Sequence, residues 1–153
     1  MADLQTIQYA VREIERYADS FVALMGPLSQ EQLWSREGNI PNSIGTLARH
    51  LTGNLNNYFG GGILKNGYIR ERAKEFGATG IAKEQVISEL LSAVKLAKQA
   101  DERIDPAIIN QPYSAPGNEA YESLAYHIVR LATHFALHCG QAEYASSFLN
   151  NQG

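Results

Sequence analysis

The chain has 153 residues, of which 44% are apolar and 19% charged, so it can bury a core and form a single domain over residues 1–153. Thirteen Lys and Arg against sixteen Asp and Glu give a net charge of −3 without a basic cluster, which argues against a nucleic-acid partner. No apolar stretch approaches the roughly eighteen residues of a membrane span, the first residues lack a signal-peptide pattern, and the single Cys139 has no disulfide partner, so we expect a cytoplasmic protein.

The first helix is predicted over residues 4–25, where apolar side chains recur at steps of three and four and form one stripe. Asp3 has the side chain of a helix N-cap, and Gly26 followed by Pro27 ends the pattern. A short helical turn is expected after Ser29.

A second apolar stripe predicts a helix that begins at Asn42 or Ser43 and continues to Tyr58. Gly45 and Gly53 lie inside this helix, although each glycine costs about 1 kcal/mol relative to alanine. We therefore expect another part of the chain to approach the helix closely at these two positions.

The connection from Gly60 to Gly80 contains repeated glycines, which predict irregular structure. A connection of this length in a compact domain is often functional, so it is a candidate wall of a substrate pocket.

Two further helices are predicted, over residues 82–104 and 119–149, with a proline-containing connection over residues 106–117 between them. No segment alternates between apolar and polar residues as a half-buried strand does. The expected fold class is therefore all-α, a four-helix bundle.

Four histidines are the main candidates for chemistry: His50 on the second predicted helix, and His127, His134 and His138 on the fourth. His134 and His138 are four residues apart, so they project from one face about 6 Å apart along the axis and can bind one metal ion. If the two helices touch, His50 can supply a third ligand, and three imidazoles leave a coordination position open, as in catalytic zinc sites. His127 is about 10.5 Å from His134 along the axis, so we expect it to be dispensable for metal and to cap or pack within the bundle.

Histidines at this spacing also have a purely structural interpretation, in which partly buried imidazoles form hydrogen bonds in a core or an interface. The segment from His134 to His138 also lacks the glutamate of the zincin motif, so that protease mechanism is not supported. Spacing alone leaves the metal-binding and structural interpretations open.

Two longer motifs resemble those of a known family. The segment from Ser43 to Asn54, SIGTLARHLTGN, is similar to the second-helix motif of the DinB superfamily, the DinB/YfiT-like bundles. The segment from His134 to Gln141, HFALHCGQ, is similar to that family's fourth-helix signature, His-x-x-x-His-x-Gly-Gln. The segment RAKEF at residues 72–76 is similar to a loop of one subgroup, and the resemblance covers essentially the whole chain.

This resemblance implies a four-helix bundle in which His50, His134 and His138 hold a divalent metal ion. Imidazole ligands suit zinc, nickel and similar ions. The resemblance also implies a homodimer. Family members with known activity include thiol-dependent transferases, which use low-molecular-weight thiols such as bacillithiol or mycothiol, and related isomerases and hydrolases.

The functional hypothesis is therefore a metal-dependent enzyme of the transferase or hydrolase type, whose catalytic residues the sequence does not identify. The alternative is a non-catalytic dimeric bundle that acts as a binding or structural module. A base close to the metal would favour the enzyme, and Glu119, Glu122 and Tyr126 are possible neighbours that spacing alone cannot place.

Three residues close to the histidines in sequence complete the set of candidates. Asn54 and Gln141 could orient a metal ligand or a bound water, although ordinary structural hydrogen bonds explain them equally well. Cys139 follows His138 directly and so projects about 100° away around the helix. We expect Cys139 to be a packed, inert thiol rather than a nucleophile.

Overall fold

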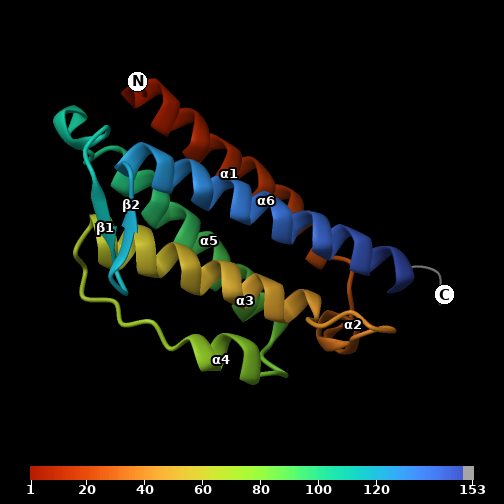
Figure 1. Ribbon diagram of the computed structural model, residues 1–153. Coiled ribbons are helices and arrows are strands. Elements are labelled where there is room, and N and C mark those ends of the chain that lie inside the picture. Colours follow the sequence, from red (N-terminus) through yellow and green to blue (C-terminus); the bar gives the residue numbers. More distant parts are fainter. Residues whose placement is uncertain (150–153) are drawn as a thin grey trace.

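The computed structural model describes residues 1–149, and these are mostly helical (Figure 1). Four long helices dominate: α1 (Leu4–Met25), α3 (Ile44–Leu55), α5 (Lys83–Asp101) and α6 (Leu124–Leu149). Shorter elements connect them: α2 (Gln30–Trp34), the π-helical segment η1 (Asn56–Ile63), α4 (Arg72–Gly77), the 3₁₀ turn η2 (Pro106–Ile108) and the strands β1 (Tyr113–Ala115) and β2 (Glu119–Tyr121). The helical fold class is thus confirmed, apart from one small hairpin.

The four long helices pack side by side around one apolar core. Helix α1 lies against α5 and α6, and α3 contacts the same two helices, as Figure 1 shows. The largest side chains of this core are fully buried and come from different helices, among them Phe21, Leu51, Leu90 and Phe135. Since α3 and α6 are in contact, side chains on their facing surfaces can meet.

Local capping chemistry explains where the helices begin. The side chain of Asp3 accepts a hydrogen bond from the backbone N–H of Thr6, which satisfies one of the free donors at the start of α1. Ser29 forms a capping box with Gln32 at the start of α2, so the short helical turn predicted after Ser29 is confirmed. Ser43 caps α3 by accepting a hydrogen bond from the backbone N–H of Thr46.

The fourth long helix begins later than predicted, because residues 119–121 form a strand instead of its first turn. Strand β2 pairs antiparallel with β1, and the turn between them contains Gly117 and Asn118, both at positive φ. The prediction that the chain has no strand and that the helix starts at Glu119 was therefore wrong. Each strand has only three residues, too few for alternation to be visible in the sequence.

The second predicted helix also extends further than expected. It continues through η1 to Ile63, so Gly60 and Gly62 are helical rather than part of an irregular loop. A side-chain carbon at Gly62 would lie 2.9 Å from the Tyr113 hydroxyl, so glycine allows the hairpin to pack closely here.

Both close approaches that the glycines of the second helix predicted are present. The ring of Trp34, from α2, covers Gly45, where a side-chain carbon would lie 2.8 Å from the ring. The carboxylate of Glu75, from α4, lies against Gly53. The glycine-rich connection therefore runs along α3 and carries the short helix α4, which the sequence did not predict (Figure 1).

Among residues 1–149, none of the helices combines the length and the apolar character that crossing a lipid bilayer requires.

Candidate metal centre

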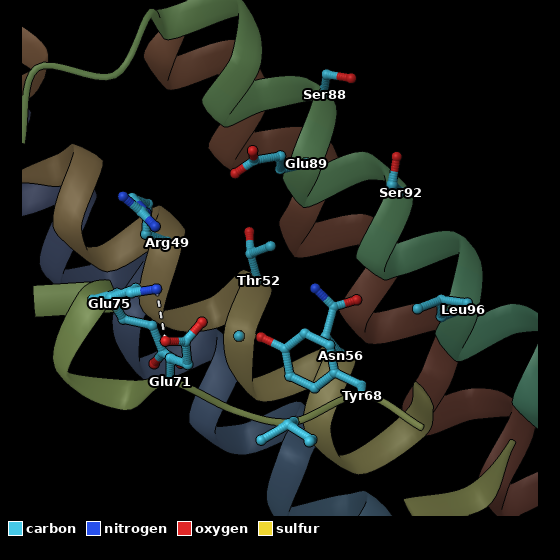
Figure 2. A pocket seen from close by; sticks show the side chains of 13 residues that line it. Arg49, Thr52, Asn56, Tyr68, Glu71, Glu75, Ser88, Glu89, Ser92 and Leu96 are labelled. Atoms are coloured by element: carbon cyan, nitrogen blue, oxygen red, sulfur yellow. Dashed lines mark ion pairs between the residues drawn. The ribbon is translucent and has the colours of Figure 1, made fainter. Parts of the chain in front are cut away.

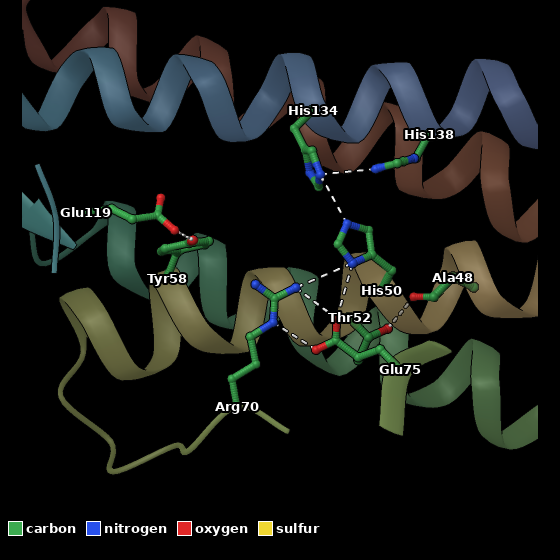
Figure 3. Close-up of polar contacts among 9 residues, drawn as sticks. All are labelled: Ala48, His50, Thr52, Tyr58, Arg70, Glu75, Glu119, His134 and His138. Carbon is green, nitrogen blue, oxygen red and sulfur yellow. Dashed lines mark hydrogen bonds and ion pairs between the residues drawn. The ribbon is translucent and has the colours of Figure 1, made fainter. Parts of the chain in front are cut away.

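Three imidazoles converge between helices α3 and α6. His50 projects from α3, while His134 and His138 project from successive turns of α6 (Figure 3). The Nε2 atom of His134 lies 3.2 Å from Nε2 of His50 and 3.0 Å from Nε2 of His138. One ligand atom from each residue falls within 4.8 Å of the others. The structure thus brings together the three histidines that the sequence proposed as metal ligands.

The outer nitrogen of His50 is held by a buried ion pair. His50 Nδ1 lies 3.2 Å from Oε1 of Glu75, and Arg70 binds both oxygens of that carboxylate at 2.8 Å. Arg70 Nη2 also lies 3.4 Å from Nδ1, but the Nε and Nη2 groups of Arg70 are already directed at the carboxylate. We therefore assign the Nδ1 proton of His50 to the bond with Glu75, which leaves Nε2 as a lone pair facing the other histidines.

Gln141 orients His138 in the same sense. Its Oε1 atom accepts a hydrogen bond from Nδ1 of His138 at 2.7 Å, so Nε2 of His138 is also a lone pair. Both lone pairs are therefore directed at Nε2 of His134. A proton on that atom could form a good hydrogen bond with only one of them, whereas a cation can accept all three nitrogens.

Two of the three nitrogen separations fit a metal ion. Nitrogens at about 2.0–2.1 Å from a tetrahedral zinc ion lie about 3.3 Å from one another. The separations of 3.0 and 3.2 Å in the cluster are close to that value. A carboxylate or carbonyl that holds the outer N–H of a ligand histidine is the usual arrangement around protein metal ions, and Glu75 and Gln141 supply it here.

Partial burial favours the neutral form of the two α6 histidines of the cluster. Desolvation, reinforced by His138 and His50, lowers the pKa of His134 to about 4. Desolvation also lowers the pKa of His138. An imidazole must be deprotonated to bind metal, so both side chains are ready to act as ligands at neutral pH.

Glu75 is the candidate site residue that sequence reasoning missed. It is 5% exposed, and although burial alone would raise its pKa, the hydrogen bonds from Arg70 and His50 outweigh this and lower it. Two signals were available: Glu75 lies within the RAKEF segment, and Gly53 predicted a close approach. Neither signal identified the residue that approaches.

His127 lies outside the cluster, within a cage of three tyrosine rings. The centroids of the Tyr58, Tyr113 and Tyr121 rings are 4.9, 5.2 and 4.3 Å from the centroid of its ring. The side chain is 1% exposed, and neither ring nitrogen has a hydrogen-bond partner within residues 1–149. Desolvation lowers its pKa to about 4. His127 therefore packs within the fold, as expected, but it caps nothing.

A cavity of about 220 Å³ extends from the cluster toward this cage. His50 and His134 line one end, and Glu119, on β2, lines the wall together with Tyr58. The Glu119 carboxylate accepts a hydrogen bond from the hydroxyl of Tyr58 (Figure 3). It accepts another from the hydroxyl of Tyr121, and this second bond is the larger cause of its lowered pKa. Glu119 is thus an ionised carboxylate in the same cavity as two candidate ligands.

The other sequence candidates are placed differently. Asn54 is buried and lines the cavity, but within residues 1–149 it forms no side-chain hydrogen bond to the histidines. Glu122 and Tyr126 are exposed and do not line the cavity. Cys139 is buried, and its thiol donates a hydrogen bond to the carbonyl of Tyr17. Burial raises the pKa of the thiol to about 12, which is consistent with an inert thiol.

A larger cavity, of about 460 Å³, lies beside α3, α4 and α5 (Figure 2). Polar residues of α3 and α5 line it, including Arg49, Thr52, Ser88 and Glu89, and no histidine of residues 1–149 does. Glu75 also lines it. The larger cavity is therefore not the one beside the candidate metal ligands. The smaller cavity is lined by two of them, His50 and His134.

Comparison with known proteins matches the chain to a family profile. The profile of a family described as "Protein of unknown function (DUF1572)", a family of the DinB-like clan, matches residues 3–153. No curated protein and no solved structure matches the chain.

Proposed function

We propose that this chain, which belongs to the DUF1572 family, binds one divalent metal ion through His50, His134 and His138, within a DinB-like four-helix bundle. The observation that carries the proposal is the convergence of three Nε2 atoms, two of which are fixed as lone pairs by Glu75 and Gln141. We further propose that the protein is a metal-dependent enzyme of the thiol-dependent transferase or hydrolase type.

Each residue of the site would have a separate role. A divalent ion held by three imidazoles supplies a Lewis acid that lowers the pKa of a bound water or thiol. Glu75 and Arg70 fix the ring of His50, and Gln141 fixes that of His138. Glu119 stays ionised in the adjoining cavity, where it can accept a proton from a bound molecule.

The alternative function, a non-catalytic binding or structural module, is less well supported. A structural metal site has four protein ligands and no access, whereas this cluster has three histidines and adjoins a cavity. The Glu119 carboxylate in the same cavity supports the enzyme over the scaffold, because a neighbouring base can assist catalysis.

Metal content is the first test. Elemental analysis of untagged protein should find close to one zinc, nickel or similar ion per chain, and His134→Ala should lose it. His127→Phe, a substitution on the same helix outside the cluster, is the matched control and should retain it. If the His134→Ala variant keeps stoichiometric metal, the proposed centre is wrong.

Thiol chemistry is the second test. Metal-loaded protein mixed with bacillithiol or mycothiol and 1-chloro-2,4-dinitrobenzene should accelerate formation of the sulfur–carbon bond, with release of chloride and one proton. Chelated protein and His50→Ala should not. If loaded protein of proven metal content accelerates neither this transfer nor ester hydrolysis, the non-catalytic alternative is favoured.

We also propose that the protein is a homodimer that pairs through α6. Five exposed apolar side chains follow one face of this helix at helical spacing: Tyr126, Val129, Leu137, Tyr144 and Phe148. A contiguous apolar face of this kind on a single chain is typical of an interaction surface.

Light scattering after size exclusion tests the dimer. Wild-type protein should have twice the mass of one chain, and Leu137→Asp should shift it toward the mass of a single chain. Ile69→Asp places the same charge at another exposed apolar position and should leave the mass unchanged. A wild-type mass equal to that of one chain across micromolar concentrations would contradict the proposed homodimer.

A further inference from the structure

The cavity beside the histidine cluster contains more positive than negative charge. Arg70, Arg72 and Arg130 line it, and Glu119 is the acidic residue among its lining side chains. Glu75 lies behind the wall and neutralises Arg70. Three arginines against two carboxylates therefore leave one excess positive charge before any metal ion is bound.

Two of these arginines form no ion pair within residues 1–149, although Arg130 shares a side-chain hydrogen bond with Tyr126. Within residues 1–149, neither Arg72 nor Arg130 has a carboxylate oxygen within 4.0 Å. Each guanidinium group instead lies near an aromatic ring, Arg72 at 5.7 Å from the centroid of Phe76 and Arg130 at 6.0 Å from that of Tyr121. The planar guanidinium group matches carboxylate and phosphate oxygens, which it binds through paired hydrogen bonds.

The cavity is small, and part of its wall is aromatic. Tyr58 and His127 are buried there, and the nitrogens of His127 have no partner within the described chain. A volume of about 220 Å³ is below the roughly 300–1,000 Å³ of pockets for drug-sized ligands. The occupant is therefore a small molecule rather than a peptide or a nucleic acid.

We propose that this cavity is the substrate pocket of the metal centre and that Arg72 and Arg130 select small molecules with a carboxylate or phosphate group. This inference rests on the proposed metal-binding function, because without the metal ion the cavity would bind an anion but would have no metal centre to act on it. The two arginines come from α4 and α6, the helices that supply Glu75 and two of the candidate ligands, so substrate recognition and metal binding use the same elements.

Acetate and acetamide are matched probes for this proposal, since they have nearly the same shape and differ in charge. Backbone amide resonances of ¹⁵N-labelled, zinc-loaded protein should shift saturably with acetate at positions that line the cavity, and acetamide should not cause these shifts. Methyl phosphate distinguishes the two anion types: tighter binding than acetate identifies a phosphate pocket, and weaker binding identifies a carboxylate pocket.

The variant Arg72→Gln/Arg130→Gln should weaken anion binding at least about tenfold, the effect expected on losing a charge-assisted hydrogen bond. The control Arg12→Gln/Arg103→Gln removes the same charge from exposed positions outside the cavity and should bind like wild type. Equal weakening in both double variants, unchanged binding in the first, or equal shifts with acetamide would each overturn the proposal.

The same titration of zinc-free protein separates this proposal from the metal-binding function. If the protein binds no zinc but still shows arginine-dependent shifts, the metal centre fails and the anion site stands. If it binds zinc without arginine-dependent shifts, the anion site fails and the metal centre stands.

Discussion

Helix α6 contains two histidines, the buried His127 and the half-buried His134, that lie seven residues apart and are neutral for the same reason. Desolvation lowers the pKa of each to about 4. Their neighbours differ completely. His134 faces two further imidazoles, at 3.0 and 3.2 Å between Nε2 atoms, whereas His127 is surrounded by tyrosine rings.

This comparison shows that burial and a lowered pKa do not by themselves identify a metal ligand. The difference comes from what the neighbouring elements direct at each ring. At His134, His50 of α3 and His138 of α6 itself supply lone pairs, whose directions are fixed by Glu75 and Gln141. At His127, the neighbouring elements supply tyrosine rings. A neutral imidazole packs against these rings, but they offer no ligand atoms that could share a metal ion with it.

The largest expected effect is the loss of metal affinity in His50→Ala. Altering groups that merely orient a ligand costs about 10–100-fold in affinity, so removing a ligand should cost more than about 100-fold. His127→Phe should bind zinc as tightly as wild type. Competition titration against a chelating dye measures the zinc affinity of both variants. If His127→Phe lost affinity and His50→Ala kept it, the assignment of the two histidine environments would be wrong.

The second prediction concerns the pH dependence of folding in zinc-free protein. The folded-state pKa of His127 is about 4, below the unfolded value near 6.5. The unfolded chain therefore binds more protons between these values, and stability is lost as pH falls from 6.5 toward 4. At pH 5 this costs about 2 kcal/mol of the unfolding free energy, since the side chain is 1% exposed.

His127→Phe should remove this share of the pH dependence. Urea unfolding at pH 7.5 and pH 5 should show a smaller loss of unfolding free energy in the variant than in wild type. His134 is retained in both proteins, so its own contribution cancels from the comparison. An equal loss in the two proteins would show that His127 is protonated in the folded state or is not buried.

The third prediction tests whether Glu75 matters to the metal through His50. In Gly53→Ala the new side-chain carbon would overlap the Glu75 carboxylate, which must move away from Nδ1 of His50. Zinc affinity should fall about tenfold, the lower end of the effect expected for a group that orients a ligand. Gly45→Ala is the matched control on the same helix, because it displaces Trp34 instead.

Gly45→Ala should therefore lower thermal stability without changing zinc affinity per folded molecule. Calorimetric titration of both variants with zinc, at a temperature where both remain folded, makes the measurement. Similar zinc affinities in the two variants would mean that Glu75 has no influence on the cluster.

The smallest expected effect is that of chelation on helical structure. The apolar core is formed by side chains of all four long helices and does not depend on the histidines. Far-ultraviolet circular dichroism should therefore be nearly unchanged when a chelator removes the metal, while the melting temperature decreases because the ion stabilises the folded state by binding to it. Loss of the helical signal would make the ion structural, as in a zinc finger.

The sequence by itself determined the features that depend on local geometry. Helical repeat placed His134 and His138 on one face, and capping residues such as Ser29 and Ser43 marked where helices begin. The two glycines of α3 also predicted close contacts correctly. Each of these follows from residues within a few turns of one another, so the spacing along the chain carries the information.

Only the tertiary structure decided which distant groups meet. Glu75 reaches His50 from 25 residues away, and its position depends on the path of the glycine-rich connection, which has no periodic pattern to read. Similarly, the hairpin that brings Glu119 and Tyr121 to the cavity is too short to be visible as alternation. The sequence could therefore propose the three metal ligands and the nearby Gln141, but the contact of Glu75 with His50 and the charge of the adjoining cavity emerge only when the helices pack.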